Sequence, residues 1–368
     1  MSVRALVALL LAVALLAPVA QARDHKDDDD RDDDRPRKAD RETRPKPWLG
    51  EFSTAPGDRN VTGEFVRFNW TDAGITGYAV GSTPWFDVAI DGSRHDARES
   101  RGTAARGASI DVETARYSLK AHDRPKGQLV VRTDGVASLK LAAGVSIHAL
   151  ENGVRLSTEH HTAILTARGD GLDVQGDVVS AEGGFTFSTL GRPSEHLDPA
   201  ESQIAGALAD KRLGAEVAVV KENGAVRNDV VSYRNVTVAT TTGDGKVTFT
   251  IDGHGFDGRV LVFRVDPALV GNASIENLRL TFDGAPMTLA SNLTDVLNPD
   301  DDGLIPEAWL VSDTEGYQLI ASVPHYSVHV LSLEGLIREA PPSVVVGLVA
   351  GALILGVGTL VLFRRPKA

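Results

Sequence analysis

Apolar and polar residues alternate along most of the chain between residues 48 and 340. Val66, Phe68 and Trp70 alternate with polar neighbours, and the same period of two recurs in three later segments. The apolar positions there are Ala137, Leu139 and Leu141; Val247, Phe249 and Ile251; and Leu278, Leu280 and Phe282. A period of two gives a strand one buried and one exposed face. The pattern predicts a mainly β protein with one or two antiparallel β-sandwich-like domains.

Turn dipeptides separate the predicted strands. Each is Asn or Asp followed by Gly, a pair that tight hairpins favour. They are Asp134-Gly135, Asn152-Gly153, Asp170-Gly171, Asn223-Gly224, Asp252-Gly253, Asp257-Gly258 and Asp283-Gly284. Turn signals about nine or ten residues apart also suit a β-solenoid. We rank the solenoid second because no side-chain motif repeats with the turns.

One short helix is expected among the strands. Asp198 can cap it, Pro199 takes its first position and Glu201 completes a capping box. Its apolar stripe consists of Ile204, Ala207 and Leu208. Gly214 is expected to end it.

The helix marks the expected boundary between two β domains. The first would occupy residues 48–194, and the second, with the helix, residues 195–340. The alternative is one large sandwich with the helix covering its end.

Residues 344–363 have a different pattern, since twenty apolar or small residues follow one another without a charge. At about 1.5 Å per residue, such a helix spans the roughly 30 Å hydrocarbon core of a bilayer. We expect a transmembrane helix, preceded by a linker at 341–343 and followed by a basic cytoplasmic tail at 364–368. Gly347 and Gly351 form a GxxxG pair that would allow self-association.

The first residues predict export. Residues 1–22 combine one basic residue, a short apolar run and a small-residue ending, the pattern of a cleavable secretory leader. A retained N-terminal anchor is the alternative. Residues 23–47 are almost wholly charged and are expected to form a disordered spacer. Its acidic run, 27–34, is either solvated, which we favour, or a contact for divalent cations or wall polymers.

Charge and cysteine content exclude some classes of function. Removing the leader (+1), the spacer (−1) and the tail (+3) from the total charge of −12 leaves about −15 on the remainder. Such an acidic surface argues against a nucleic-acid partner. The chain has no cysteine, so disulfides, a thiolate nucleophile and cysteine metal sites are excluded.

Five Asn-x-Ser/Thr acceptors for glycans lie in the part expected to be exported. They are Asn60, Asn69, Asn235, Asn272 and Asn292. If Phe68 faces the core, Asn69 faces solvent and can carry a glycan without disturbing packing.

Catalytic motifs are not found. The sequence has no GxSxG, HExxH, Walker-type or dinucleotide-binding glycine motif in the required context. A Ser-His-Asp triad is defined by geometry, which the presence of these residues does not establish. The sequence therefore favours a protein that is not an enzyme.

Metal sites have three candidates. Two are histidine pairs, His160-His161 beside Glu159, and His325 with His329. On a strand, His325, Ser327 and His329 would share one face. We favour structural or surface histidines, because a closed zinc site needs four ligands. The third candidate is a calcium loop at Asp300, Asp301 and Asp302, with a plain solvated turn as the favoured alternative.

The four tryptophans have two interpretations. They are Trp48, Trp70, Trp85 and Trp309. Exposed, they would form a platform for carbohydrate, but aromatic residues at strand positions are more often core residues.

The run from Asp257 to Leu333 contains Val323-Pro324-His325-Tyr326-Ser327-Val328-His329, followed by an apolar strand, a linker and the apolar segment. It resembles the membrane-proximal β domain of archaeal cell-surface proteins with a single C-terminal span. The resemblance implies an envelope location. Ala340-Pro341-Pro342 replaces the Pro-Gly-Phe sorting signal of some such proteins.

Three functional hypotheses follow. The favoured one is a non-enzymatic envelope protein whose β ectodomain is structural or binds a protein, carbohydrate or cation. The second is a surface-tethered hydrolase without a recognisable motif. The third is a sensor or assembly partner that pairs through the membrane helix.

Overall fold

The computed structural model describes residues 48–335, except 56, 93–101, 170, 191–196, 198, 223, 235, 244, 254–258, 271–277, 300–304, 314–315, 324 and 326. These residues belong to one compact unit. Within them, no helix has both the length and the apolar character needed to span a bilayer. The expected leader, spacer and transmembrane segment lie outside the described residues.

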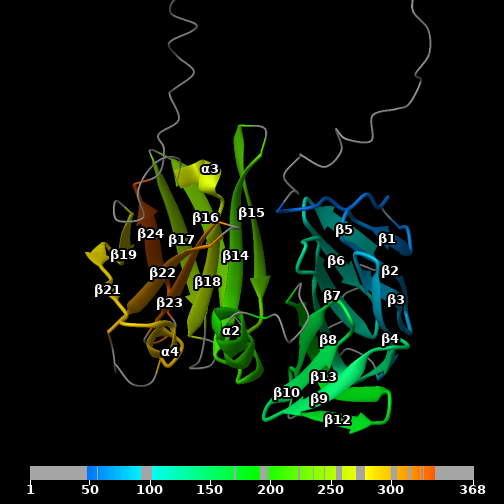
Figure 1. Ribbon diagram of the computed structural model, residues 1–368. Coiled ribbons are helices and arrows are strands. Elements are labelled where there is room, and N and C mark those ends of the chain that lie inside the picture. Colours follow the sequence, from blue (N-terminus) through cyan, green and yellow to red (C-terminus); the bar gives the residue numbers. More distant parts are fainter. Residues whose placement is uncertain are drawn as a thin grey trace, which may run out of the picture. The chain divides into compact units, whose positions relative to one another are not determined.

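The protein is mainly β, as predicted, and its first body is a single antiparallel sheet (Figure 1). Its strands are β1 (Asn60–Thr62), β2 (Val66–Thr71), β3 (Gly74–Val80), β4 (Thr83–Asp91), β5 (Gly102–Arg106), β6 (Ser109–Glu113), β7 (Tyr117–His122), β8 (Gln128–Leu141), β9 (Ser146–Leu150), β10 (Gly153–Ser157), β11 (Thr162–Ala167), β12 (Leu172–Gln175) and β13 (Val178–Thr189). The main order is β1-β2-β3-β4-β8-β13-β11-β10-β9. Every pairing in this sheet is antiparallel, so the solenoid is excluded for this region.

Two long strands fold this sheet over itself. Residues 128–133 of β8 pair with β7, whereas residues 136–141 pair with β4. β13 accompanies β8 along both parts and has a register shift between Glu182 and Gly184. Strands that change sheet at a bulge form the corners of a sandwich. Side chains of both parts fill one core.

Asp134-Gly135, predicted as a turn, lies inside β8 instead. A Cβ atom at Gly135 would lie 1.9 Å from the carbonyl oxygen of Asp91 on β4. The glycine therefore allows a close approach of two backbones at the corner. From the sequence alone, an Asp-Gly pair with this role looks the same as one in a turn.

Aromatic rings form the centre of the first core. Phe187 packs against Trp85, Tyr78 and Phe86, with ring centroids 5.2, 5.5 and 4.9 Å away. Trp70 and Trp85 are buried, which confirms the core interpretation for these two tryptophans. Trp48 and Trp309 are partly buried, so none of the four stands out as an exposed platform.

The second body contains two sheets and the helices. Its strands are β14 (Leu213–Glu222), β15 (Ala225–Ser232), β16 (Val236–Gly243), β17 (Lys246–Gly253), β18 (Val260–Val265), β19 (Arg279–Phe282), β20 (Ala285–Pro286), β21 (Thr288–Leu289), β22 (Glu307–Asp313), β23 (Gly316–Ser322) and β24 (His329–Glu334). The helices are α2 (Pro199–Ala209), α3 (Pro267–Val270) and α4 (Leu293–Val296). One sheet has the order β15-β14-β18-β23-β22-β21, and the other β16-β17-β24-β19-β20.

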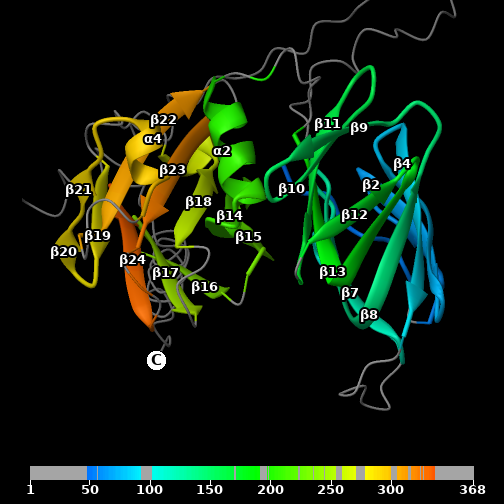
Figure 2. The same cartoon turned by 90° about the horizontal axis from the view of Figure 1, so that it is seen from below.

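The two sheets of the second body pack as a sandwich. Phe249 of β17 and Phe263 of β18 meet in its core, with ring centroids 4.3 Å apart. The other face of the six-stranded sheet packs against α2 and α4, where Leu208 and Val262 belong to one cluster (Figure 2). Because both faces are covered, β14 and β18 are apolar along most of their length instead of alternating.

Helix α2 begins at Pro199, as predicted, but ends at Ala209 and not at Gly214. Lys211 adopts a left-handed conformation, with φ of 62°, and the amide of Arg212 donates to the carbonyl of Ala207. A non-glycine residue thus ends the helix in the position that glycine usually occupies. Gly214 lies in β14.

Several predicted turns have the expected form. Gly153 pairs with Leu150 across a tight hairpin between β9 and β10. Asp283 and Gly284 both have positive φ, 50° and 82°, as in a type I′ turn between β19 and β20. Gly253 instead lies in β17, where it pairs with Val236 of β16. Asp170, Asn223 and the Asp257-Gly258 pair lie outside the described residues.

Candidate functional site

Three of the five predicted glycan acceptors are among the residues that the structure describes, and all three are exposed. Asn69 faces solvent between buried Phe68 and Trp70, as predicted from the pleat. Asn60 is its direct partner on the neighbouring strand. The side chain of Asn292 caps α4 by accepting from the amide of Asp295. Asn235 and Asn272 lie outside the described residues.

The metal candidates find no support among the residues that the structure describes. His161 bonds to Thr83 at 2.9 Å, whereas His160 lies at the surface near Glu159. Among the described residues, no group of three or more His, Asp or Glu side chains could hold a metal ion. Asp300, Asp301 and Asp302, the predicted calcium ligands, lie outside the described residues.

The most extensive buried polar cluster joins the two bodies. We call it the interface network: His122, Arg124, Lys126 and Gln128 from the β7–β8 hairpin, with Glu201, Glu216, Asp229, Tyr233 and Arg264 of the second body. Arg124 Nε and His122 Nδ1 both bond to the carboxylate of Asp229, the histidine at 2.9 Å. Arg124 Nη2 also donates to the main-chain oxygen of Asp229 at 2.6 Å. All three side chains are nearly inaccessible to solvent.

Glu216, on β14, is the second anionic centre of the interface network. One carboxylate oxygen accepts from Arg264 Nε at 3.0 Å and is 3.4 Å from Arg124 Nη1. The other accepts from Gln128 Nε2 and the Tyr233 hydroxyl, each at 3.2 Å. Buried charges of this kind are tolerated only when they are paired and hydrogen-bonded.

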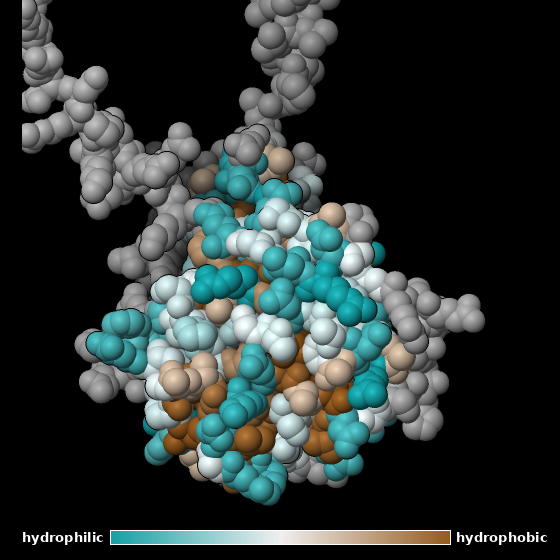
Figure 3. All heavy atoms as spheres, turned by 90° about the vertical axis from the view of Figure 1, so that its right-hand side faces the viewer, coloured by the Kyte–Doolittle hydropathy of each residue, from teal (hydrophilic) through white to brown (hydrophobic). Residues whose placement is uncertain are grey.

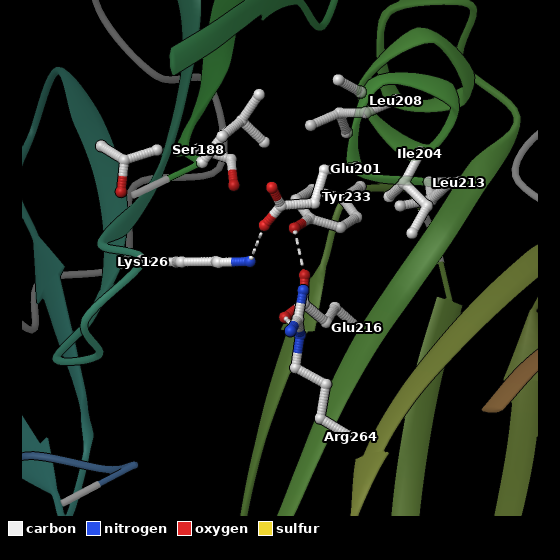
Figure 4. A pocket seen from close by; sticks show the side chains of 12 residues that line it. Lys126, Ser188, Glu201, Ile204, Leu208, Leu213, Glu216, Tyr233 and Arg264 are labelled. Atoms are coloured by element: carbon white, nitrogen blue, oxygen red, sulfur yellow. Dashed lines mark hydrogen bonds and ion pairs between the residues drawn. The ribbon is translucent and has the colours of Figure 1, made fainter. Parts of the chain in front are cut away.

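A small pocket opens beside Glu216, between the β7–β8 hairpin and α2. In Figure 4, Lys126 points toward Glu201, and Tyr233 toward Glu216. Lys126 Nζ donates to Glu201 at 2.9 Å. The opposite wall is apolar and includes Ile204 and Leu208. The space left for a water-sized sphere is about 20 Å³, which is room for a water and not for a metabolite.

Two of the three carboxylates of the interface network, Asp229 and Glu216, are held in their ionised form. Burial raises the pKa of Asp229, but Arg124 and His122 outweigh burial and lower it below its ordinary value of 3.8. Burial likewise raises the pKa of Glu216, and Arg264 and Arg124 lower it below 4.5. A carboxyl with a lowered folded pKa contributes stability above its unfolded pKa and loses it as pH falls.

We therefore predict acid sensitivity of the contact between the bodies. The free energy of unfolding should be constant at neutral pH and fall progressively below about pH 4.5. In that range Asp229 and Glu216 bind protons in the unfolded protein but stay ionised in the folded one. Urea midpoints measured from pH 7 to pH 2 test this. The variant Asp229→Asn should show a shallower decline, and identical slopes for both proteins would contradict the prediction.

A second polar cluster lies at the start of β24. Ser327 Oγ lies 2.9 Å from His329 Nε2, and His329 Nδ1 lies 2.7 Å from Asp283 Oδ2. Asp283 Oδ1 accepts from the amide of Val330 at 2.8 Å. Ser327 is exposed, whereas His329 is 7% exposed and packs on Phe282. We call Ser327, His329 and Asp283 the serine cluster.

The proton positions in the serine cluster follow from its acceptors. Partial burial raises the pKa of Asp283, but the Val330 amide and His329 outweigh burial and lower it. An ionised carboxylate only accepts hydrogen bonds, so His329 Nδ1 carries the proton. In the neutral imidazole, His329 Nε2 then accepts from the Ser327 hydroxyl.

The sequence predicted part of the serine cluster and missed the interface network. It placed Ser327 and His329 on one face of a strand, but β24 begins only at His329 and Ser327 precedes it. It also placed Asp283 in a tight turn, without any sign that the turn meets β24. The network joins side chains about a hundred positions apart, such as Arg124 and Asp229. Charged residues in otherwise apolar strands, such as Glu216 in β14, are the one available signal.

Comparisons with protein-family models, curated proteins and solved structures find no match. The class of the protein is therefore defined by its fold. It is a mainly β protein in which a folded-over sheet and a helix-covered sandwich share a buried ionic contact.

Proposed function

We propose that this protein is an exported surface protein, anchored by one C-terminal span, whose β ectodomain has a structural or binding role in the envelope. The leader at residues 1–22 and the apolar segment at 344–363 support this location. The resemblance of residues 257–333 to the membrane-proximal β domain of archaeal cell-surface proteins supports the same location.

The interface network is the observation that carries the structural role. Contacts between domains of one chain are usually polar and allow relative motion. Here two buried carboxylates of the second body bond to the first, and separating the bodies would break the bonds of Asp229 to Arg124 and His122 and that of Glu216 to Arg124. The two bodies should therefore move as one block. A protein that holds a partner at a fixed distance from a membrane requires such rigidity.

The surface supports a binding partner that tolerates an acidic, polar face. On the side seen in Figure 3, apolar residues form separate areas divided by hydrophilic residues. An envelope protein or a cation fits such a surface better than a nucleic acid does. The burial of Trp70 and Trp85 disfavours a carbohydrate platform built from them. Glycans at Asn60, Asn69 and Asn292 would leave the cores undisturbed.

Protease treatment of intact cells tests the proposed location. With one epitope tag inserted in residues 23–47 and another after Ala368, protease should remove the first and spare the second. Deleting residues 344–363 should release the protein into the medium. A protected N-terminal tag, or a full chain that stays soluble without detergent, would contradict the proposal.

A further inference from the structure

We propose that Ser327, His329 and Asp283 form a nucleophilic site that hydrolyses acyl esters reaching the protein from solvent. The nucleophile bonds to Nε2 of the imidazole, and the carboxylate bonds to Nδ1 of the same ring. This order is the one that serine hydrolases on unrelated folds share. The activity would be additional to the structural role and does not depend on it.

Each member of the serine cluster has a suitable environment. Ser327 is exposed, so its hydroxyl can meet a substrate. The ring of His329 is buried, lies against Phe282 and meets His325 edge-on at 5.2 Å, which restricts its rotation. Asp283 is fixed by the Asp-Gly turn and by the amide of Val330. A base oriented in this way is what nucleophilic catalysis requires.

A purely structural role explains only part of this geometry. Asp283 would connect the β19–β20 turn to β24 through Val330 and His329 alone. The bond from exposed Ser327 to His329 adds little to such a connection, because hydrogen bonds at the surface are exchanged readily with water.

The reaction has two steps that balance. Ser327 Oγ bonds to the ester carbonyl carbon while its proton passes to His329 Nε2, and the intermediate then expels the alcohol, which takes that proton. In the second step, water gives a proton to His329 Nε2 and attacks the acyl-serine. Ser327 leaves with that proton, so the products are one alcohol and one carboxylic acid. Asp283 stays ionised and acts as the positioning residue for His329.

A fluorophosphonate probe tests whether Ser327 is a nucleophile. The full chain, purified in detergent, is treated with the probe, and the modified peptide is identified by mass spectrometry. We expect the label on Ser327 and its loss in Ser327→Ala. Ser53, also exposed, bonds to the carbonyl of Thr62 and not to a histidine, so Ser53→Ala should label normally.

Asp283→Asn separates a catalytic arrangement from a structural one. An amide in this place still accepts from Val330 but donates to His329 Nδ1, which moves the ring proton to Nε2 and removes the acceptor for Ser327. We expect labelling, and turnover of p-nitrophenyl acetate, to fall at least about 100-fold, with the melting temperature within about 4 °C of the original. Absence of label on Ser327, or equal rates in both proteins, would overturn the proposal.

Discussion

Replacing Arg124 by Ala should lower the free energy of unfolding by about 3–5 kcal/mol. Arg124 is 4% exposed and bonds to both Asp229 and Glu216. Without it, two carboxylates stay buried with fewer cations, and the cost of their desolvation is no longer offset. Urea unfolding of the full chain in detergent measures the effect. We also expect the single transition to separate into two, because the interface network is broken and only apolar contacts, such as those around Leu208 and Val220, still join the bodies.

A surface ion pair supplies the matched control for Arg124. Lys120, on the same hairpin, lies 3.8 Å from Asp111, and both side chains are more than a third exposed. Lys120→Ala should cost less than about 1 kcal/mol. A double-mutant cycle of Arg124→Ala with Asp229→Ala should give a coupling energy above about 1 kcal/mol. If Arg124→Ala costs no more than Lys120→Ala, the network does not hold the bodies together.

Replacing Phe187 by Ala should cost about 3–5 kcal/mol, because the ring is fully buried among Tyr78, Trp85 and Phe86. The three neighbouring rings are too rigid to fill the cavity that the substitution leaves. Chemical denaturation monitored by tryptophan fluorescence measures the loss.

The control for Phe187 is an exposed residue of the same body. Val174 on β12 is 41% exposed, and Val174→Ala should change stability by less than about 0.5 kcal/mol. Equal effects at the two positions would mean that the aromatic cluster is not the centre of the first core.

Phe187→Ala and Arg124→Ala affect different parts of the structure. Phe187→Ala weakens the core of the first body and leaves the interface network in place. Arg124→Ala leaves both hydrophobic cores in place and weakens the contact between the bodies, which still share the apolar clusters around Leu208 and Val220. Unfolding with two transitions is therefore expected only for Arg124→Ala.

Alternation along single strands was sufficient to predict a mainly β protein with antiparallel sheets, but not the parallel pairing of β14 with β18 and of β21 with β22. Asn69 faces solvent between Phe68 and Trp70 because a pleated strand turns successive side chains to opposite faces. Local signals also placed the start of α2 at Pro199 and the tight turn at Asp283. These features depend on neighbours within a few residues, which a single sequence contains.

Features that depend on distant contacts were not predictable. Gly135 has the local pattern of a turn, and only the approach of Asp91 makes it the corner of a long strand. Lys211 adopts positive φ because the chain must enter β14 directly, although its sequence favours no such conformation. The pairing of Arg124 with Asp229 depends on how two bodies meet, which no local periodicity records.

The distance between the two bodies tests the central claim most directly. Because the chain has no cysteine, Thr76→Cys on β3 and Thr241→Cys on β16 create a unique pair of exposed labelling sites. Pulsed electron paramagnetic resonance between spin labels there should give one narrow distance distribution at pH 7, and a broad one after Arg124→Ala. A broad distribution in the chain with Arg124 intact at pH 7 would contradict the account of the two bodies as a single rigid block.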